Sequence, residues 1–303
     1  MTRAAGPLGR FVGYDQERLV VSSGGRPASG PNAALLIRRV AWADVQPDQR
    51  EPAAAALREE AAVNMLPRGL LQAAQQRRAA AVARLVARGT TCHELRVRPV
   101  WRLAVGLGEE TPSETGLRLH GTYGVPVLPG SALKGTARAH ARDRQPDDAD
   151  SDYETGAEDY AGYGSATFGN EPGDTGHAAA GAVVFLDALP EALRSPRGAV
   201  AVDVVNPHVS GYYRTGGQTP PAEYLQPVPV QFLAVTAEVA FRVHVLGRGP
   251  DADTAEIAAD QACGWLRAAL AKRGLGAKTN AGYGYFDVEV VQPARAGEQA
   301  TGR

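Results

Sequence analysis

Four glycines within eleven residues, Gly274 to Gly284, separate a helical pattern from a strand pattern near the end of this chain of 303 residues. Glycine reaches positive φ angles and lets another backbone approach closely. The segment before the glycines, Thr254 to Lys272, predicts a helix, and the segment after them, Tyr285 to Val291, predicts a strand. The apolar stripe of the helix consists of Ile257, Ala258, Ala262, Trp265, Leu266, Ala269 and Leu270. A helix must therefore turn tightly into a closing strand at this point.

The glycine loop itself has two interpretations. Its N–H groups can form a concave anion site, and its polar and aromatic side chains suit a phosphate chain with a stacked base. Under this interpretation, the residues that bind the phosphate chain and its base are Gly276, Lys278, Thr279, Asn280, Gly282 and Tyr283. The alternative is a purely structural helix-to-strand turn. The G-x-x-x-x-G-K-[ST] spacing of an ATP-binding loop is absent, so we do not expect ATP hydrolysis.

The remaining patterns predict further helices and strands. A helical pattern over about 51–88 is interrupted at Pro67 and stops at Gly89. The other expected elements are a strand Leu95–Val105, a helix Ser131–Arg144, and strands Ala182–Leu186, Ala199–Val205, Val228–Val235 and Glu238–Leu246. This order predicts an α+β fold with a ferredoxin-like (RRM-like) antiparallel sheet and helices on one face. The aromatic signature of RNA-recognition sheets is missing, so any RNA contacts are expected from loops and helices.

A basic face is predicted on the helix that begins near Ser131, a candidate N-cap. Lys134, Arg138 and Arg142 are four residues apart and share one side of that helix. Like charges at this spacing repel, and a bound polyanion would relieve the repulsion. The alternative is a solvated face, which also accounts for the eight arginines against one acid between Arg68 and Arg102.

Composition limits the classes of function. The net charge of −1 excludes a generally basic nucleic-acid binder, so any such site is a local patch. Cys92 and Cys263 have no metal-ligand spacing and suit a reducing cytoplasm as small buried residues. No signal peptide or membrane-spanning run is expected. Seven acids between Asp147 and Asp159 lie in an apparent insertion over 145–180 and lack the calcium-loop pattern. We therefore expect no metal and no cofactor.

Three motifs carry a family resemblance that covers roughly residues 92–291. The stretch P-G-S-A-L-K-G, Pro129 to Gly135, together with the glycine loop, resembles the RAMP superfamily of CRISPR proteins. The stretch V-D-V-V-N-P-H-V-S-G-Y-Y, Val202 to Tyr213, and F-L-D-A-L-P, Phe185 to Pro190, resemble the family of sixth subunits of the Cmr (type III-B) RNA-guided effector complex.

The resemblance implies a noncatalytic subunit in antiviral defence. Such a subunit would bind guide RNA and target RNA near the guide 3′ end and cap the backbone filament. Its neighbours would be the backbone RAMP subunit, the small helical subunit and the first Cmr subunit. RNA contacts would come from the glycine loop and from Ser131, Lys134, Arg138 and Arg142.

The extent of the resemblance, together with the composition and helical pattern before it, suggests a division of the chain. Residues 1–90 would be an arm and helical extension packed on the core. Residues 91–292 would be the RAMP ferredoxin-like domain, including the insertion at 145–180. Residues 293–303 would be a flexible tail.

Two other functions stay open at this stage. A RAMP-type endoribonuclease could process guide precursor or cleave target RNA, with His120 or His140 as general base. Related backbone subunits cleave through a loop aspartate, but Leu107 to Gly130 contains no aspartate, and we expect no catalytic residue. A purely architectural cap would use its basic residues against acidic protein surfaces instead.

Overall fold

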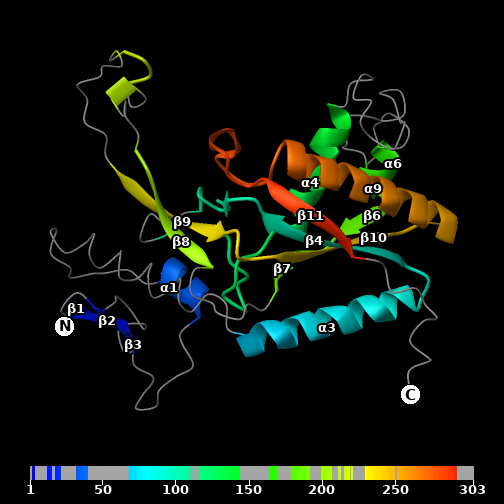
Figure 1. Cartoon of the computed structure of the whole chain (residues 1–303), viewed down its shortest axis with the longest axis horizontal. Helices are drawn as coiled ribbons and strands as arrows, with labels where there is room; N and C mark the ends of the chain where they lie inside the picture. Colours follow the sequence, from blue (N-terminus) through cyan, green and yellow to red (C-terminus); the bar gives the residue numbers. More distant parts are fainter. Residues whose placement is uncertain are drawn as a thin grey trace.

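The structure is a computed structural model of the whole chain (Figure 1). It describes residues 2–3, 12–15, 18–21, 32–39, 68–109, 111, 116–143, 164–169, 179–191, 199–206, 211–212, 215–218, 220, 229–249 and 251–291. The elements are β1 (Thr2–Arg3), β2 (Val12–Asp15), β3 (Arg18–Val21), α1 (Ala33–Arg39), α3 (Arg68–Val86), β4 (Thr91–Pro99), β5 (Arg102–Leu103), α4 (Gly130–Arg142), α6 (Ser165–Phe168), β6 (Val183–Phe185), β7 (Leu189–Pro190), β8 (Val200–Val205), β9 (Val230–Thr236), β10 (Phe241–Gly247), α9 (Ala252–Lys272) and β11 (Phe286–Val291).

The central sheet has the strand order β11-β4-β10-β6, and each neighbouring pair is antiparallel. Along the chain these strands and their helices follow the order β4, α4, β6, β10, α9, β11. The sheet therefore places its fourth strand beside its first and its third beside its second, which is the ferredoxin-like arrangement. This confirms the predicted fold class.

Helices α4 and α9 cover one face of the sheet (Figure 1). Leu133, Ala137 and Ala141 form the buried side of α4, as the spacing predicts. Trp265 of α9 packs against Phe168 of α6, with 5.4 Å between the ring centroids. Burial of these apolar side chains supplies the main stabilisation of this layer.

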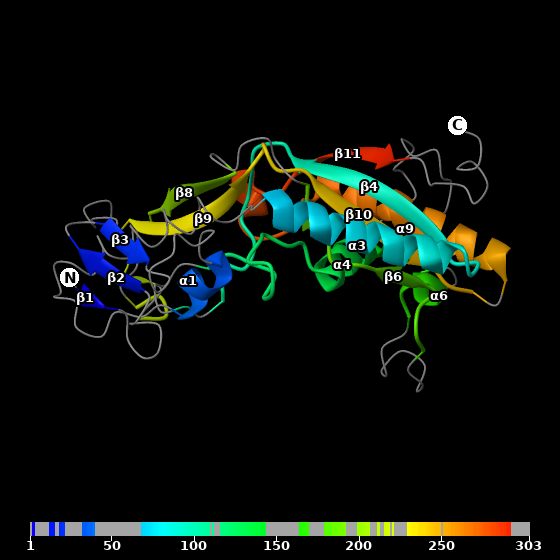
Figure 2. The ribbon, with the colours of Figure 1, turned by 90° about the horizontal axis from the view of Figure 1, so that it is seen from below.

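Helix α3 lies along the opposite face of the sheet (Figure 2). The side-chain amide of Gln75 donates to the carbonyls of Leu189 and Pro190 at 3.2 and 2.9 Å. Beneath the helix, Arg96 and Arg242 both form ion pairs with Glu191. This sheet face is therefore a paired mixture of charges partly covered by α3, and it offers no continuous aromatic platform of the RNA-recognition kind.

The predicted single strand over 95–105 is wrong in one respect, because the chain bends at Val100 and Trp101. Strand β4 ends at Pro99, and β5 joins a second sheet with the order β5-β9-β8. Leu95, Val97, Leu103 and Val105 are nevertheless buried, as their parity predicts, although Ala104 of the opposite parity is buried as well. The bend carries one amphipathic strand pattern from the central sheet into a neighbouring one. Figure 2 shows β8 and β9 reaching away from the central sheet.

The strands expected near 182–186, 199–205, 228–235, 238–246 and 285–291 are all present with small shifts in their ends. The predicted apolar stripe of α9 is wrong at Ile257, which is 54% exposed. This residue lies next to the buried side of the helix and not on it. None of the helices in the described ranges is long and apolar enough to cross a membrane.

Some predictions fall outside the described residues. These include the helical pattern over 51–67, most of the insertion at 145–180, His208, and the tail from 293 onward. Helix α1 is described, and Ala33, Leu36 and Ile37 join the main hydrophobic core.

Candidate nucleic-acid interface

The glycine loop is held by close backbone contacts with the rest of the fold. A Cβ atom at Gly284 would lie 2.0 Å from the carbonyl oxygen of Leu275, and one at Gly276 would lie 2.5 Å from that of Ala104. Both glycines have positive φ, as do Gly274 and Gly282. The loop is therefore a tight turn. Gly276 and Gly284 are required there both because a side chain would clash and because the backbone has positive φ.

Most N–H groups of the loop bind carbonyls of the chain itself. The N–H of Ala277 donates to Ala104 and that of Gly284 donates to Arg102, each across 2.7 Å. Among the described residues, the N–H groups of Leu275, Ala281, Gly282 and Tyr283 are also used within the loop. The structural turn is thus present, and the part left to meet a ligand is the tip around Lys278, Thr279 and Asn280.

Lys278 is held in the left-handed conformation, with φ of 60°, just before a 3₁₀ turn at Thr279–Ala281. A lysine at positive φ is uncommon and indicates that the surroundings fix this backbone. Its ammonium lies 5.4 Å from the ring centroid of Phe232 on β9, in cation–π range. Thr279 is half-buried, and Asn280 and Gly282 are exposed.

Tyr283 does not present the open ring that the sequence suggests, because it is 7% exposed. Its hydroxyl donates to Asp203 Oδ2 at 2.5 Å, and Arg102 Nη1 donates to the same oxygen at 2.5 Å. Burial, and then the bond to Asp203, raises the pKa of Tyr283 to about 12. Burial alone would raise the pKa of Asp203, but the hydrogen bonds from Tyr283 and Arg102 outweigh it and hold that pKa below its usual value.

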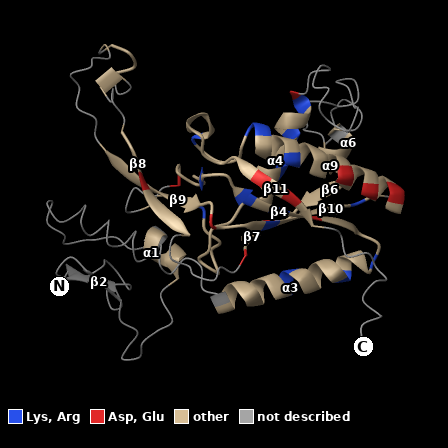
Figure 3. Ribbon diagram, viewed as in Figure 1, with Lys and Arg blue, Asp and Glu red and all other residues tan. Residues whose placement is uncertain are grey.

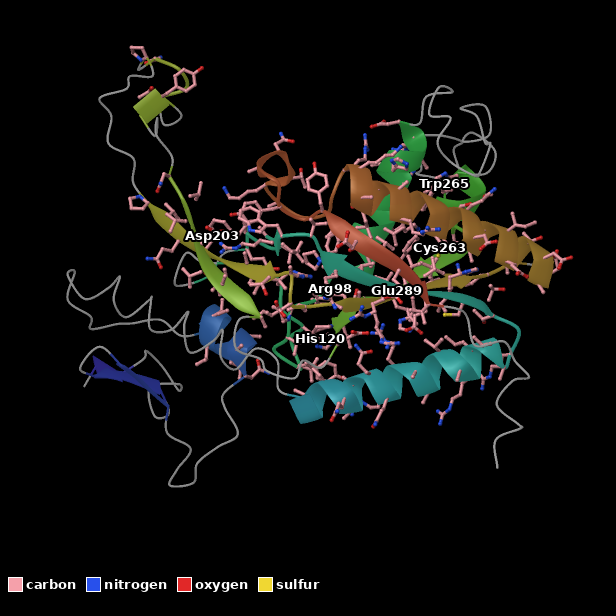
Figure 4. All side chains as sticks on the ribbon, in the orientation of Figure 1. Arg98, His120, Asp203, Cys263, Trp265 and Glu289 are labelled. Carbon is pink, nitrogen blue, oxygen red and sulfur yellow. The ribbon has the colours of Figure 1, made fainter. Side chains whose placement is uncertain are left out.

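Trp101 is the aromatic residue that this region exposes, and sequence reasoning missed it. It is 49% exposed, and its ring centroid lies 4.8 Å from that of Tyr283. The guanidinium of Arg102 lies 5.3 Å from the indole centroid. In the sequence, the adjacent pair Trp101-Arg102 was the available indication of an aromatic and cationic cluster. The contacts with Tyr283 and Asp203 come from segments far away in the sequence, and Figure 4 labels Asp203 on β8.

The start of α4 differs from the sequence prediction. Ser131 is an exposed residue inside the first turn, and Pro129 holds the N-cap position without a side-chain bond. The carboxylate of Asp187 accepts from the N–H of Gly130 at 2.8 Å and supplies the cap from another segment. Ser131 as the N-cap is therefore wrong, and its side chain is left at the surface.

The basic face of α4 is present, with Lys134 and Arg138 half-buried and Arg142 exposed. Burial lowers the pKa of Lys134, and the nearby charges of Arg138 and Arg248 lower it further. A partly desolvated ammonium beside two guanidinium groups is an environment that an anion would stabilise.

An ion pair links the C-terminal ends of α4 and α9. Arg273, just before the loop, forms an ion pair with Asp143, just after α4. Figure 3 shows basic residues on α4 and at this end of α9, whereas the acids of α9 lie on its first half. The ion pair connects the end of α4 to the start of the glycine loop. Helices α4 and α9 lie on the same face of the sheet.

The candidate catalytic histidines have structural contacts. His120 Nδ1 accepts from the N–H groups of Thr122 and Tyr123, each at 3.3 Å, and its ring stacks on that of Tyr123 at 4.4 Å. Burial lowers the pKa of His120. Figure 4 shows its position near α3. His140 is half-buried on α4. Among the described residues no group of three His, Cys, Asp or Glu side chains could hold a metal ion.

Burial disfavours the thiolate form of both cysteines. Burial raises the pKa of Cys263 to about 12 and that of Cys92 to about 11, with nearby carboxylates adding to both. Cys263 is buried as predicted, whereas Cys92 is only half-buried.

Comparison with known proteins assigns the family. The RAMP superfamily model matches residues 97–287, which run from the last residues of β4 into β11 and include α4, α9 and the glycine loop. This chain belongs to the RAMP superfamily.

A more particular similarity follows. The chain is similar to the CRISPR system Cmr subunit Cmr6 of Pyrococcus furiosus, with 31% identity over 229 residues that cover 60% of this chain and 64% of that protein. The alignment therefore spans just under two thirds of the relative's own length.

One of the similar solved structures shares the fold. A chain in the cryo-EM structure of the type III-B Cmr-beta complex bound to cognate target RNA superposes with a TM-score of 0.61 at 20% identity, over 81% of this chain and 75% of that one. The crystal structure of Cmr6 from Pyrococcus furiosus is 27% identical, with a TM-score of 0.41 over 65% of this chain and 97% of that one.

Proposed function

We propose that this protein is a noncatalytic RNA-binding subunit of a type III-B CRISPR (Cmr) effector complex, acting in the cytoplasm in antiviral defence. The observation that carries the proposal is the 31% identity to Cmr6 within a chain of the RAMP superfamily. In this role it binds the guide and target RNA near the guide 3′ end and caps the filament of backbone subunits. Its partners are the backbone RAMP subunit, the small helical subunit and the first Cmr subunit.

We assign the RNA contacts to α4 and the tip of the glycine loop. Lys134 supports this, because its described electrostatic neighbours are the cations Arg138 and Arg248. Lys278 supports it from the loop, because its fixed backbone presents the ammonium beside Phe232. Buried Tyr283 supports the loop through its hydrogen bond to Asp203. The other residues of the proposed interface are Ser131, Arg138, Arg142, Gly276, Thr279, Asn280 and Gly282.

The noncatalytic assignment is supported by the contacts of His120, one of the two candidate general bases. His120 accepts two backbone hydrogen bonds at Nδ1 and stacks on Tyr123, so its ring is committed to a turn. A general base must instead be free to reach the proton it removes. We also propose the division at about residue 90, with α1 and α3 as an extension packed on the RAMP domain over 91–292.

The proposal is tested by tagging the full chain in the cells that encode it and purifying it under native conditions. Recovery of the other Cmr proteins with a small guide RNA is expected. Recovery of the chain alone, or with unrelated proteins, would overturn the proposal. Incubation of the purified chain with labelled repeat RNA, with and without EDTA, tests the endoribonuclease alternative, and we expect the RNA to stay intact.

A further inference from the structure

We propose that the exposed side of the Trp101 indole stacks on one unpaired base of single-stranded RNA while Lys278 meets a neighbouring phosphate. The inference rests on the proposed function and deepens it, because it assigns a base contact to a residue outside the sequence motifs.

The indole is fixed in place although it is half exposed. Trp101 lies in the bend between β4 and β5, and the residues on both sides are bound to the end of the glycine loop. The N–H of Val100 donates to the carbonyl of Tyr285 at 2.8 Å, and the N–H of Gly284 donates to that of Arg102 at 2.7 Å. A surface aromatic ring on such a braced bend loses little conformational entropy when a ligand stacks on it.

The described aromatic and cation–π contacts of the indole come from one side. Tyr283 and Arg102, which make these contacts, both donate to the same oxygen of Asp203. Two groups that share one acceptor atom must lie close together, so they cover the indole from the same side. The 49% exposure of Trp101 therefore belongs to the opposite side.

The charges beside the ring favour a nucleotide. Arg102 is neutralised by Asp203, so Lys278 supplies the positive charge of this cluster. The ammonium of Lys278 lies over the ring of Phe232. The ring of Tyr283 contacts both Phe232, at 5.8 Å between centroids, and Trp101. An aromatic face and an ammonium connected through Tyr283 and Phe232 match a base joined to its phosphate. A base within a duplex is already stacked, so an unpaired base is the suitable ligand.

The test measures binding of the full chain to a labelled single-stranded uridine oligomer and to an abasic oligomer of equal length. Trp101→Ala is expected to weaken binding of the uridine oligomer roughly tenfold and to leave the abasic oligomer unaffected. Lys278→Ala is expected to weaken both. Val100→Ala, a change at the exposed neighbour, should alter neither, and Trp101→Phe should retain most of the affinity.

Fluorescence gives a second measurement that does not depend on how Trp101→Ala folds. The difference in emission between the wild-type chain and Trp101→Phe isolates Trp101 from Trp42 and Trp265. The uridine oligomer should quench this difference, and the abasic oligomer should leave it unchanged.

The outcomes separate the inference from the proposed function. Equal uridine-oligomer affinity of wild type and Trp101→Ala, with weaker binding by Lys278→Ala, overturns the stacking site and retains RNA binding. Loss of a co-purified Cmr protein from Trp101→Ala at unchanged RNA affinity assigns the indole to a protein contact and also overturns it. Failure of the wild-type chain to bind either oligomer, alone or within its complex, removes RNA binding itself.

Discussion

The hydroxyl of Tyr283 donates a 2.5 Å hydrogen bond to Asp203, which joins the glycine loop to strand β8, eighty residues earlier in the chain. Arg102 of β5 donates to the same carboxylate oxygen. Three segments therefore meet on one carboxylate, and the shape of the loop depends on tertiary contacts as well as on its glycines.

Removal of the tyrosine hydroxyl should loosen this junction. Tyr283→Phe is expected to lower the free energy of unfolding by about 1.5 kcal/mol, because a hydrogen bond to a charged acceptor is lost while Arg102 still pairs with Asp203. Urea denaturation measures the change. Tyr285→Phe is the matched control, since among the described residues its hydroxyl has no hydrogen bond, and equal effects of the two changes would contradict the account.

The ionisation of Asp203 should make the stability of the fold depend on pH. Its pKa is lower in the folded chain than the usual value of 3.8. The ionised carboxylate therefore stabilises the fold above that value, and this contribution is lost as the pH falls through the folded-state pKa. Asp203→Asn should be less stable than wild type at pH 7, and the gap should shrink between pH 5 and pH 3. A gap that stays constant over this range would show that the charge of Asp203 contributes nothing.

The glycines of the loop should differ in their tolerance of a side chain. Gly284→Ala places a Cβ 2.0 Å from the Leu275 carbonyl oxygen at positive φ. The change should therefore cost more than Gly282→Ala, which has positive φ but open space and should cost about 1 to 2 kcal/mol. Thermal unfolding of the two variants compares them directly, and the prediction is wrong if Gly282→Ala is the more damaging change.

The start of α4 allows a test of which residue caps it. Asp187→Ala removes the acceptor of the Gly130 N–H and should destabilise the protein by about 1 kcal/mol. Ser131→Ala should change stability by less than about 0.5 kcal/mol, because Ser131 is exposed and does not occupy the N-cap position. Asp187→Asn should recover part of the loss. The reverse ranking of Asp187→Ala and Ser131→Ala in urea denaturation would restore Ser131 as the cap.

The sequence was sufficient for the parts of the fold that depend on local periodicity. Leu133, Ala137 and Ala141 were predicted to face inward on α4 and do so. The strand parity of Leu95 and Leu103 also identified their burial correctly. Burial of an amphipathic face follows from spacing alone, and the order of such elements was enough to indicate the ferredoxin-like sheet.

The remaining features depend on partners far away in the sequence. Periodicity continues across Val100 and Trp101, so it cannot reveal that the chain leaves one sheet for another there. The cap of α4 comes from Asp187, 57 residues after Gly130, where no local pattern could locate it. Tyr283 looked like an exposed ring because its acceptor, Asp203, lies on a different sheet.

The central claim is that α4 and the glycine loop hold RNA, and a salt titration of RNA binding tests it most directly. The full chain is compared with Lys134→Ala/Arg138→Ala/Lys278→Ala, and with Arg84→Ala/Arg88→Ala/Arg267→Ala as a control that removes three charges from exposed positions on α3, on the turn after it and on α9. The account predicts weaker binding by the first variant only, with a slope of log affinity against log salt that is smaller by about 2, since each lost phosphate contact on single-stranded RNA lowers it by roughly 0.7. An unchanged affinity and slope for the first variant, with its fold intact, would contradict the account.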